Sequence, residues 1–228
     1  MGVSNTDSFI DEVTEEVRRD KLFGTMRKYG WIAVVAVVAV VGGASWNEYQ
    51  KSQTVNAARA TGDALLEALG ENEAAARVTA LQNATLSSAQ ADVVRQFLLS
   101  AEQAGSGSDA EAAQTLDGFL STSPDAALIY KSIAELKALM LGAESIPAEE
   151  RRARLEAMSQ PGLPLALLAS EQLALAEIAD GQSDAAISRL QAIILDAGVS
   201  SGLRQRSTQL IVALGGVPET LPSLSATQ

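Results

Sequence analysis

The chain has 228 residues, a formal net charge of −11, and neither cysteine nor histidine. Without these two residue types it can form no disulfide and has no thiolate nucleophile, no imidazole base and none of the usual zinc ligand sets. The first 46 residues carry five bases and six acids, whereas the remainder carries 12 bases and 22 acids. An acidic domain repels phosphate backbones, so we expect no nucleic-acid partner.

The N-terminal residues 1–28 are predicted to be an amphipathic stub in the cytoplasm. Within this stub, residues 7–23 have a helical pattern, because apolar residues recur at spacings of three and four: Phe9, Ile10, Val13 and Val17. So short a helix cannot bury its apolar stripe by itself. Three alternatives stay open, namely a helix along the membrane surface, a helix docked on a partner, and a solvated helix that continues toward the next segment.

Residues 29–46 form an uncharged apolar stretch, which as a helix is about 27 Å long and matches the hydrocarbon core of a bilayer. Amphipathic rings stand at both of its ends, as interface anchors do: Tyr29, Trp31, Trp46 and Tyr49. A buried core helix is normally amphipathic, and a cleaved signal peptide has its bases close to the first residue and a shorter apolar core. We therefore predict one retained transmembrane helix.

The charges on either side of this segment predict its orientation. Five bases precede it closely, whereas only Lys51 and Arg59 follow it in the next 20 residues. The positive-inside rule then places the N-terminus in the cytoplasm and the large domain outside. Within the segment, Ala39 and Gly43 form a small-xxx-small pair, which is either a packing face for another helix or a consequence of ordinary span composition.

Beyond the span, alanine and leucine dominate, and valine is concentrated in residues 34–41, so the composition predicts an all-α chain. Breaks at glycine, serine and proline predict a domain over 47–214. Its helices are expected over 47–69, 72–84, 88–104, 109–121, 125–141, 147–158, 164–180, 183–196 and 201–214. The tail over 215–228, which contains Pro218 and Pro222, is expected to be disordered.

The domain also contains an internal repeat. Placing Gly107 on Gly181, an offset of 74 residues, superimposes apolar positions in the flanking segments: Leu99 on Leu173, Ala112 on Ala186, Leu116 on Leu190 and Phe119 on Ile193. The offset equals two units of 37 residues, with an intervening unit over about 127–160. Small residues let paired helices approach closely, while large residues fill the seam to the next unit.

This pattern resembles the tetratricopeptide repeat, with a small residue after the first helix, alanine midway in the second, a large apolar residue four positions later, and a terminating proline, Pro124. Two aromatic positions of that repeat are occupied here by Gln103 and Glu177. The middle unit also departs from the pattern, with Pro147 and a charged run over 149–154. The resemblance implies a helical-hairpin solenoid.

Almost the whole chain is similar to the bacterial ancillary subunit family of the Sec translocon, also described as tetratricopeptide repeat-like inner-membrane proteins. The similarity lies in the acidic-then-basic stub FIDEVTEEVRRDKL, the RKYGW start of a single span, and the repeat domain. It implies a single-pass inner-membrane protein whose periplasmic domain contacts the translocon, periplasmic chaperones or translocating chains.

A search for catalytic motifs finds no phosphate-binding glycine loop, no nucleophile elbow and no triad. We therefore expect a non-enzyme with no catalytic residue, cofactor, metal site or small-molecule substrate. The bases Arg151, Arg152 and Arg154 either bind an acidic partner or pair with Glu149 and Glu150 on a solvated helix face. Two functions follow as hypotheses: a membrane-anchored interaction scaffold, or an assembly subunit of another inner-membrane complex held through its span and stub.

Overall fold

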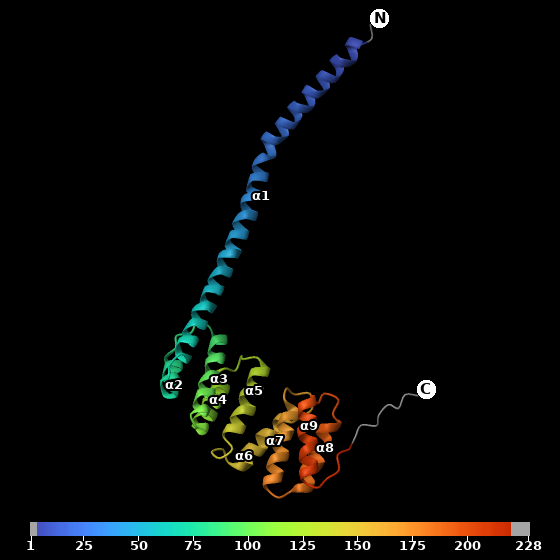
Figure 1. Ribbon diagram of the computed structural model, residues 1–228. Helices are drawn as coiled ribbons and strands as arrows, with labels where there is room; N and C mark the ends of the chain where they lie inside the picture. Colours follow the sequence, from blue (N-terminus) through green and yellow to red (C-terminus); the bar gives the residue numbers. More distant parts are fainter. Residues whose placement is uncertain (1–3, 220–228) are drawn as a thin grey trace, which may run out of the picture. The chain divides into compact units, whose positions relative to one another are not determined.

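The computed structural model describes the backbone of residues 4–219 and the side chains from Arg27 onward, Ala33 excepted. All regular elements in this range are helices, which confirms the all-α prediction (Figure 1). They are α1 (Ser4–Leu69), α2 (Ala74–Asn83), α3 (Ala89–Gly105), α4 (Asp109–Thr122), α5 (Leu128–Leu141), α6 (Ala148–Met158), α7 (Ala166–Ala179), α8 (Ser183–Leu195) and α9 (Ser201–Ala213). The chain divides into two compact units between Ala60 and Thr61.

Helix α1 merges three segments that the sequence predicted separately, 7–23, 29–46 and 47–69. The first 123 residues contain no proline, and isolated glycines weaken a helix without ending it. The helix ends at Leu69, and the N–H of the following Gly70 donates to the carbonyls of Leu66 at 2.9 Å and Glu67 at 3.0 Å. The side chains of residues 1–26 lie outside the described residues, so the apolar stripe of the stub stays a prediction.

In the second unit the helices α2 to α9 match the eight ranges predicted after residue 70, with each boundary within three residues. Side chains cap two of the starts. Ser88 accepts a hydrogen bond from the N–H of Ala91 at the start of α3, and Ser200 does the same for Leu203 at the start of α9. Such caps satisfy backbone donors that have no partner within the helix.

The core of this unit is a series of four local clusters, each joining helices that are close in sequence. The end of α1 packs with α2 and α3, then α4 with α5, then α5 with α6 and α7, and finally α7 with α8 and α9. Phe119 is the largest fully buried side chain, and its ring centroid lies 6.0 Å from that of Phe97 on α3. The fold therefore rests on short-range packing between successive helices.

The start of the tail is held against α8. Gln191 donates to the carbonyl of Val217 at 2.7 Å and accepts from the N–H of Glu219 at 3.0 Å. Gly216 permits this course, because a Cβ there would lie 2.9 Å from Cγ2 of Ile211. Disorder was expected over 215–228; residues 215–219 instead follow this bonded path, and residues 220–228 lie outside the described residues.

Candidate functional site

The predicted span lies within α1 and has no buried side chain among its described residues. The helix is long and apolar enough to cross a membrane, with a mean hydropathy of 1.8 in its most apolar window. Its valines are exposed, for example Val40 at 72% and Val34 at 62%. This exposure disagrees with a buried core helix, whose apolar side chains would contact other helices.

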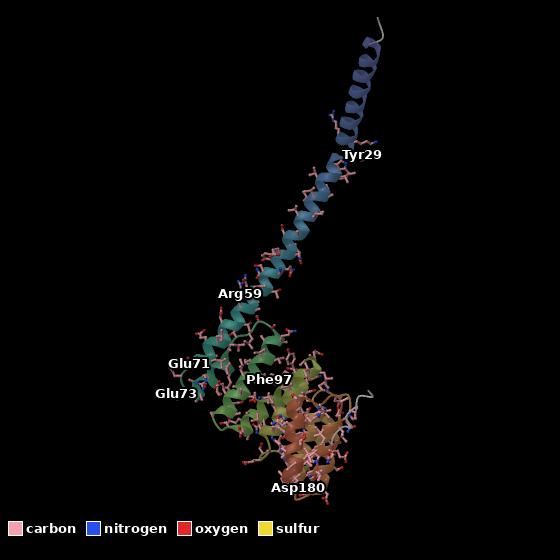
Figure 2. All side chains as sticks on the ribbon, turned by 45° about the vertical axis from the view of Figure 1, so that its right-hand side comes forward. Tyr29, Arg59, Glu71, Glu73, Phe97 and Asp180 are labelled. Carbon is pink, nitrogen blue, oxygen red and sulfur yellow. The ribbon has the colours of Figure 1, made fainter. Side chains whose placement is uncertain are left out.

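The four aromatic anchors are exposed on α1 near the two ends of this stretch (Tyr29 is labelled in Figure 2). Their exposed fractions run from 52% for Tyr29 to 65% for Trp31 and Trp46, with Tyr49 at 59%. Trp46 and Tyr49 also contact each other, with ring centroids 6.2 Å apart. Rings that are exposed at both ends of an apolar helix suit the two headgroup regions of a bilayer.

Ala39 and Gly43 are both exposed on α1, as a small-xxx-small packing face requires. A Cβ added at Gly43 would find nothing within 4 Å. The pair is therefore open to close approach by another helix, and its use in packing stays a prediction.

The apolar positions that the 74-residue offset superimposes are all buried in the second unit. These are Leu99, Ala112, Leu116, Phe119, Leu173, Ala186, Leu190 and Ile193. They lie on α3, α4, α7 and α8, and they belong to the seams between successive helices. Pro124 is exposed in the α4–α5 connection, where its carbonyl accepts from Lys131 at 2.9 Å.

The turns after α3 and α7 have the same geometry at the same offset. Gly107 and Gly181 have φ values of +83° and +76°, a region that favours glycine. The N–H of Ser108 donates to the backbone carbonyl of Gln103 at 2.9 Å. Likewise, the N–H of Gln182 donates to the backbone carbonyl of Glu177 at 2.8 Å. The repeat in sequence is thus also a repeat in backbone conformation.

Gln103 and Glu177, which occupy two positions where the tetratricopeptide repeat has aromatic residues, each belong to a buried polar pair. Gln103, 5% exposed, accepts from the hydroxyl of Thr115 at 2.7 Å. Glu177, 4% exposed, accepts from Arg189 at 2.6 Å. Each pair joins residues 12 apart across one helical hairpin. Sequence reasoning treated the two positions only as departures, although the shared spacing of 12 was a signal of pairing.

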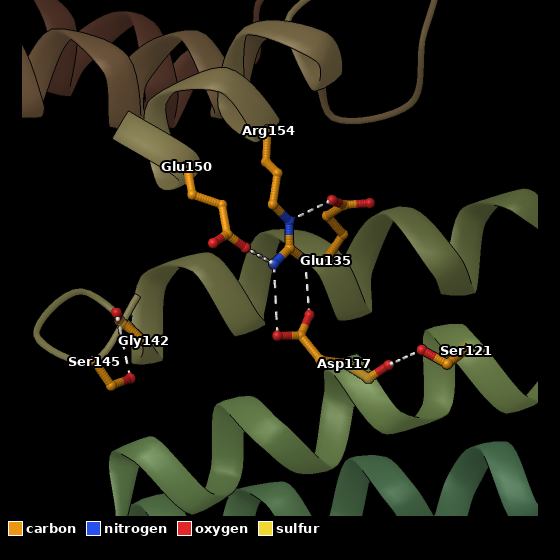
Figure 3. A network of polar contacts seen from close by, with 7 residues as sticks. All are labelled: Asp117, Ser121, Glu135, Gly142, Ser145, Glu150 and Arg154. Carbon is orange, nitrogen blue, oxygen red and sulfur yellow. Dashed lines mark hydrogen bonds and ion pairs between the residues drawn. The ribbon is translucent and has the colours of Figure 1, made fainter. Parts of the chain in front are cut away.

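Arg154 is the centre of a charged network between three helices (Figure 3). Its guanidinium donates to Asp117 on α4 at 2.7 Å and to Glu135 on α5 at 3.0 Å, and it lies 3.8 Å from Glu150. The hydrogen bonds with Asp117 raise the pKa of Arg154 most, against burial, which lowers it, and the bond with Glu135 raises it further. The arginine is therefore held in its charged form.

Pairing on its own helix, one of the two alternatives for this charged run, accounts for the contact between Arg154 and Glu150 but not for Arg152. Arg152 pairs with Asp180 at the end of α7. On α9, Arg206 pairs with the buried Glu171 of α7 at 2.8 Å, and this hydrogen bond raises the pKa of Arg206. These cations connect helices, because their partners lie on neighbouring elements.

Several grooves of about 440–470 Å³ lie at the surface of the second unit, and two of them, of about 460 Å³ and about 440 Å³, occur next to the starts of α3 and α7. The first lies between the start of α3, the α4–α5 connection and the start of α5. The second lies between the α6–α7 connection, the start of α7 and the α8–α9 connection. Both have mixed walls in which apolar side chains predominate. Within the described residues, no three acidic side chains are grouped so as to hold a metal ion.

The described residues thus define an all-helical protein with one N-terminal helix apolar enough to cross a membrane. Comparison with protein-family models, curated proteins and solved structures finds no match. The function is therefore inferred from residues and geometry.

Proposed function

We propose that this chain is a single-pass membrane protein whose helical domain is a scaffold for protein–protein contacts. The observation that carries the proposal is an uncharged helical stretch with no buried side chain, followed in the same chain by a domain of paired helices. The bases before the stretch support an orientation with the N-terminus in the cytoplasm and the domain in the periplasm of a bacterial cell.

The domain is proposed to be a tetratricopeptide-like solenoid. Support comes from the equivalent glycine turns at Gly107 and Gly181 and from a core divided into local clusters. Proteins built from stacked helical pairs bury their apolar residues mainly between neighbouring repeats. They present extended surfaces to partners and need no reactive groups.

The complex proposed for this scaffold is the Sec translocation machinery, with periplasmic chaperones or translocating chains as clients. The stub, the span and the repeat domain resemble the ancillary subunit family of that machinery. The alternative is an assembly subunit of another inner-membrane complex. The open surface at Ala39 and Gly43 favours that alternative, because it offers a helix-packing face inside the bilayer.

A protease-protection assay tests the topology. In inverted inner-membrane vesicles the proposed periplasmic domain lies inside, so added protease should leave a fragment that begins near the span and contains α2 to α9. Detergent should abolish the protection. Digestion of the domain in sealed vesicles would refute the orientation.

Site-specific photo-crosslinking separates the two candidate functions. A photoreactive residue is placed at Val94 or Val212 in the domain and at Val40 in the span, since all three are exposed. Crosslinks from the domain positions to a stalled translocating chain support the scaffold. Crosslinks from Val40 alone, together with normal growth after deletion of the domain, would support the assembly subunit and refute the scaffold.

A further inference from the structure

The two surface grooves occupy equivalent places in the repeat. Residues that line the first groove superimpose on residues that line the second at the same offset of 74: Val93 and Leu167, Val94 and Leu168, Pro124 and Gly198. In both places the groove forms where the start of the first helix of a pair meets the connection that follows the second helix. The repeat therefore presents the same kind of hollow twice.

The apolar surface around each groove is partly exposed. Beside the first groove, Val94 and Tyr130 are each 49% exposed, and in the second Leu163 is 43% exposed. Val93, which also lines this groove, packs with Phe97 against the cluster that contains Phe119. A half-exposed side chain on a packed support can bury further area when an apolar group enters the groove.

Each groove also has one carboxylate in its lining and no basic side chain there. In the first groove this carboxylate is Asp125. In the second it is Asp196, whose Oδ1 accepts from the N–H of Gly198 at 2.7 Å. The nearby Lys131 is bonded to the carbonyl of Pro124. These acids belong to a region, residues 47–228, that has ten more acids than bases, so a cation is favoured at each groove.

We propose that the two grooves bind one class of ligand, an extended polypeptide in which leucine-like or aromatic side chains stand next to lysine or arginine. The apolar side chain enters a groove, and the adjacent cation pairs with Asp125 or Asp196. A chain with two such positions engages both grooves, which raises its apparent affinity above that of either groove alone. This inference rests on the proposed scaffold function and specifies its client.

The test uses the full chain in nanodiscs of phosphatidylcholine and a fluorescein-labelled peptide in which leucine and lysine recur with serine spacers. Binding is followed by fluorescence anisotropy, with empty nanodiscs as the blank. The peptide should bind, and replacing its lysines by glutamine or its leucines by serine should weaken binding. Asp125→Asn and Asp196→Asn should each weaken binding of the lysine peptide about threefold. Neither substitution should change binding of the glutamine peptide.

Matched controls use positions outside the grooves. Glu144→Gln removes one exposed charge from the α5–α6 connection, and Val212→Ala shortens an exposed apolar side chain on α9. Both should bind like the unaltered chain, whereas Tyr130→Ala and Leu163→Ala should each weaken binding about tenfold. The helical circular dichroism of every variant verifies that it is folded.

Three outcomes would overturn the inference: equal binding of the lysine and glutamine peptides, equal losses in the control and groove variants, or self-association of the full chain that Tyr130→Ala abolishes. The last result would identify a second copy as the occupant. Failure here is distinguishable from failure of the scaffold function. Translocating chains crosslinked at Val212 but not at Val94 or Leu163 would keep the scaffold and reject the grooves.

Discussion

Replacing Arg154 by methionine tests how much the charged network between α4, α5 and α6 contributes to stability. The substitution keeps much of the side chain's length and apolar stem but removes the donors to Asp117 and Glu135. Those two contacts are short, at 2.7 and 3.0 Å, while the contact with Glu150 is 3.8 Å. The side chains are about a quarter to a third exposed, so solvent screens the pairs in part.

A partly exposed charge-assisted hydrogen bond of this kind contributes about 1 kcal/mol. The two short contacts therefore contribute about 2 kcal/mol to the free energy of unfolding. For a domain of this size, each kcal/mol shifts the melting temperature by about 2–4 °C, so Arg154→Met should lower it by about 4–8 °C. Thermal unfolding of the full chain in detergent, followed by circular dichroism, measures the shift.

Two further variants separate charge from packing. Glu150→Gln removes only the longest contact and should change the free energy of unfolding by less than about 0.5 kcal/mol. Adding Asp117→Asn and Glu135→Gln to Arg154→Met should recover part of the loss, because no carboxylates then repel each other without a cation. If Arg154→Met melted within a degree or so of the unaltered chain, the network would have no structural role.

Four other substitutions test the packing and the turns of the domain by thermal unfolding. Gly142→Ala should destabilise the domain by about 1–3 kcal/mol, since the new Cβ would lie 2.4 Å from Cδ1 of Ile146. Gly118→Ala in α4 should instead stabilise the domain by about 0.5–1 kcal/mol, because the new Cβ would have no neighbour within 4 Å. Gly181→Ala should lower the free energy of unfolding by about 1 kcal/mol, because the φ angle of Gly181 is +76°. An unchanged melting temperature would contradict this turn geometry. Phe119→Ala should cost about 3–5 kcal/mol because the ring is 1% exposed, and a loss below 1 kcal/mol would show that the core refills the space.

The sequence was sufficient for the helices of the domain because their ends carry strong local signals. The range 183–196 was predicted from Gly181 and the apolar spacing, and α8 runs over Ser183–Leu195. Periodicity likewise identified the buried positions, such as Leu190 and Ile193. These features depend on neighbours in sequence, which a single chain displays directly.

The sequence was not sufficient for contacts between distant positions. Arg154 pairs with Asp117, 37 residues away, and with Glu135 on α5; of the acids that the sequence offered on its own helix, it pairs with Glu150, at 3.8 Å. The grooves were also not predicted, because each depends on how a connection lies against the start of a helix that is distant in sequence. The continuity of α1 from the stub into the span was one of three alternatives that the sequence left open, and periodicity could not select it, because glycines at 24 and 30 weaken a helix without ending it.

The two polar pairs inside the hairpins differ in chemistry, and this difference tells similar helices apart during folding. If α7 paired with α4 in place of α8, Glu177 would face Thr115, and a buried carboxylate would have no cation. Such an unpaired charge costs several kcal/mol, so the wrong hairpin is disfavoured although its apolar residues would fit. A designer who lengthens the domain by copying a hairpin must therefore move Gln103 with Thr115, or Glu177 with Arg189, as a matched couple.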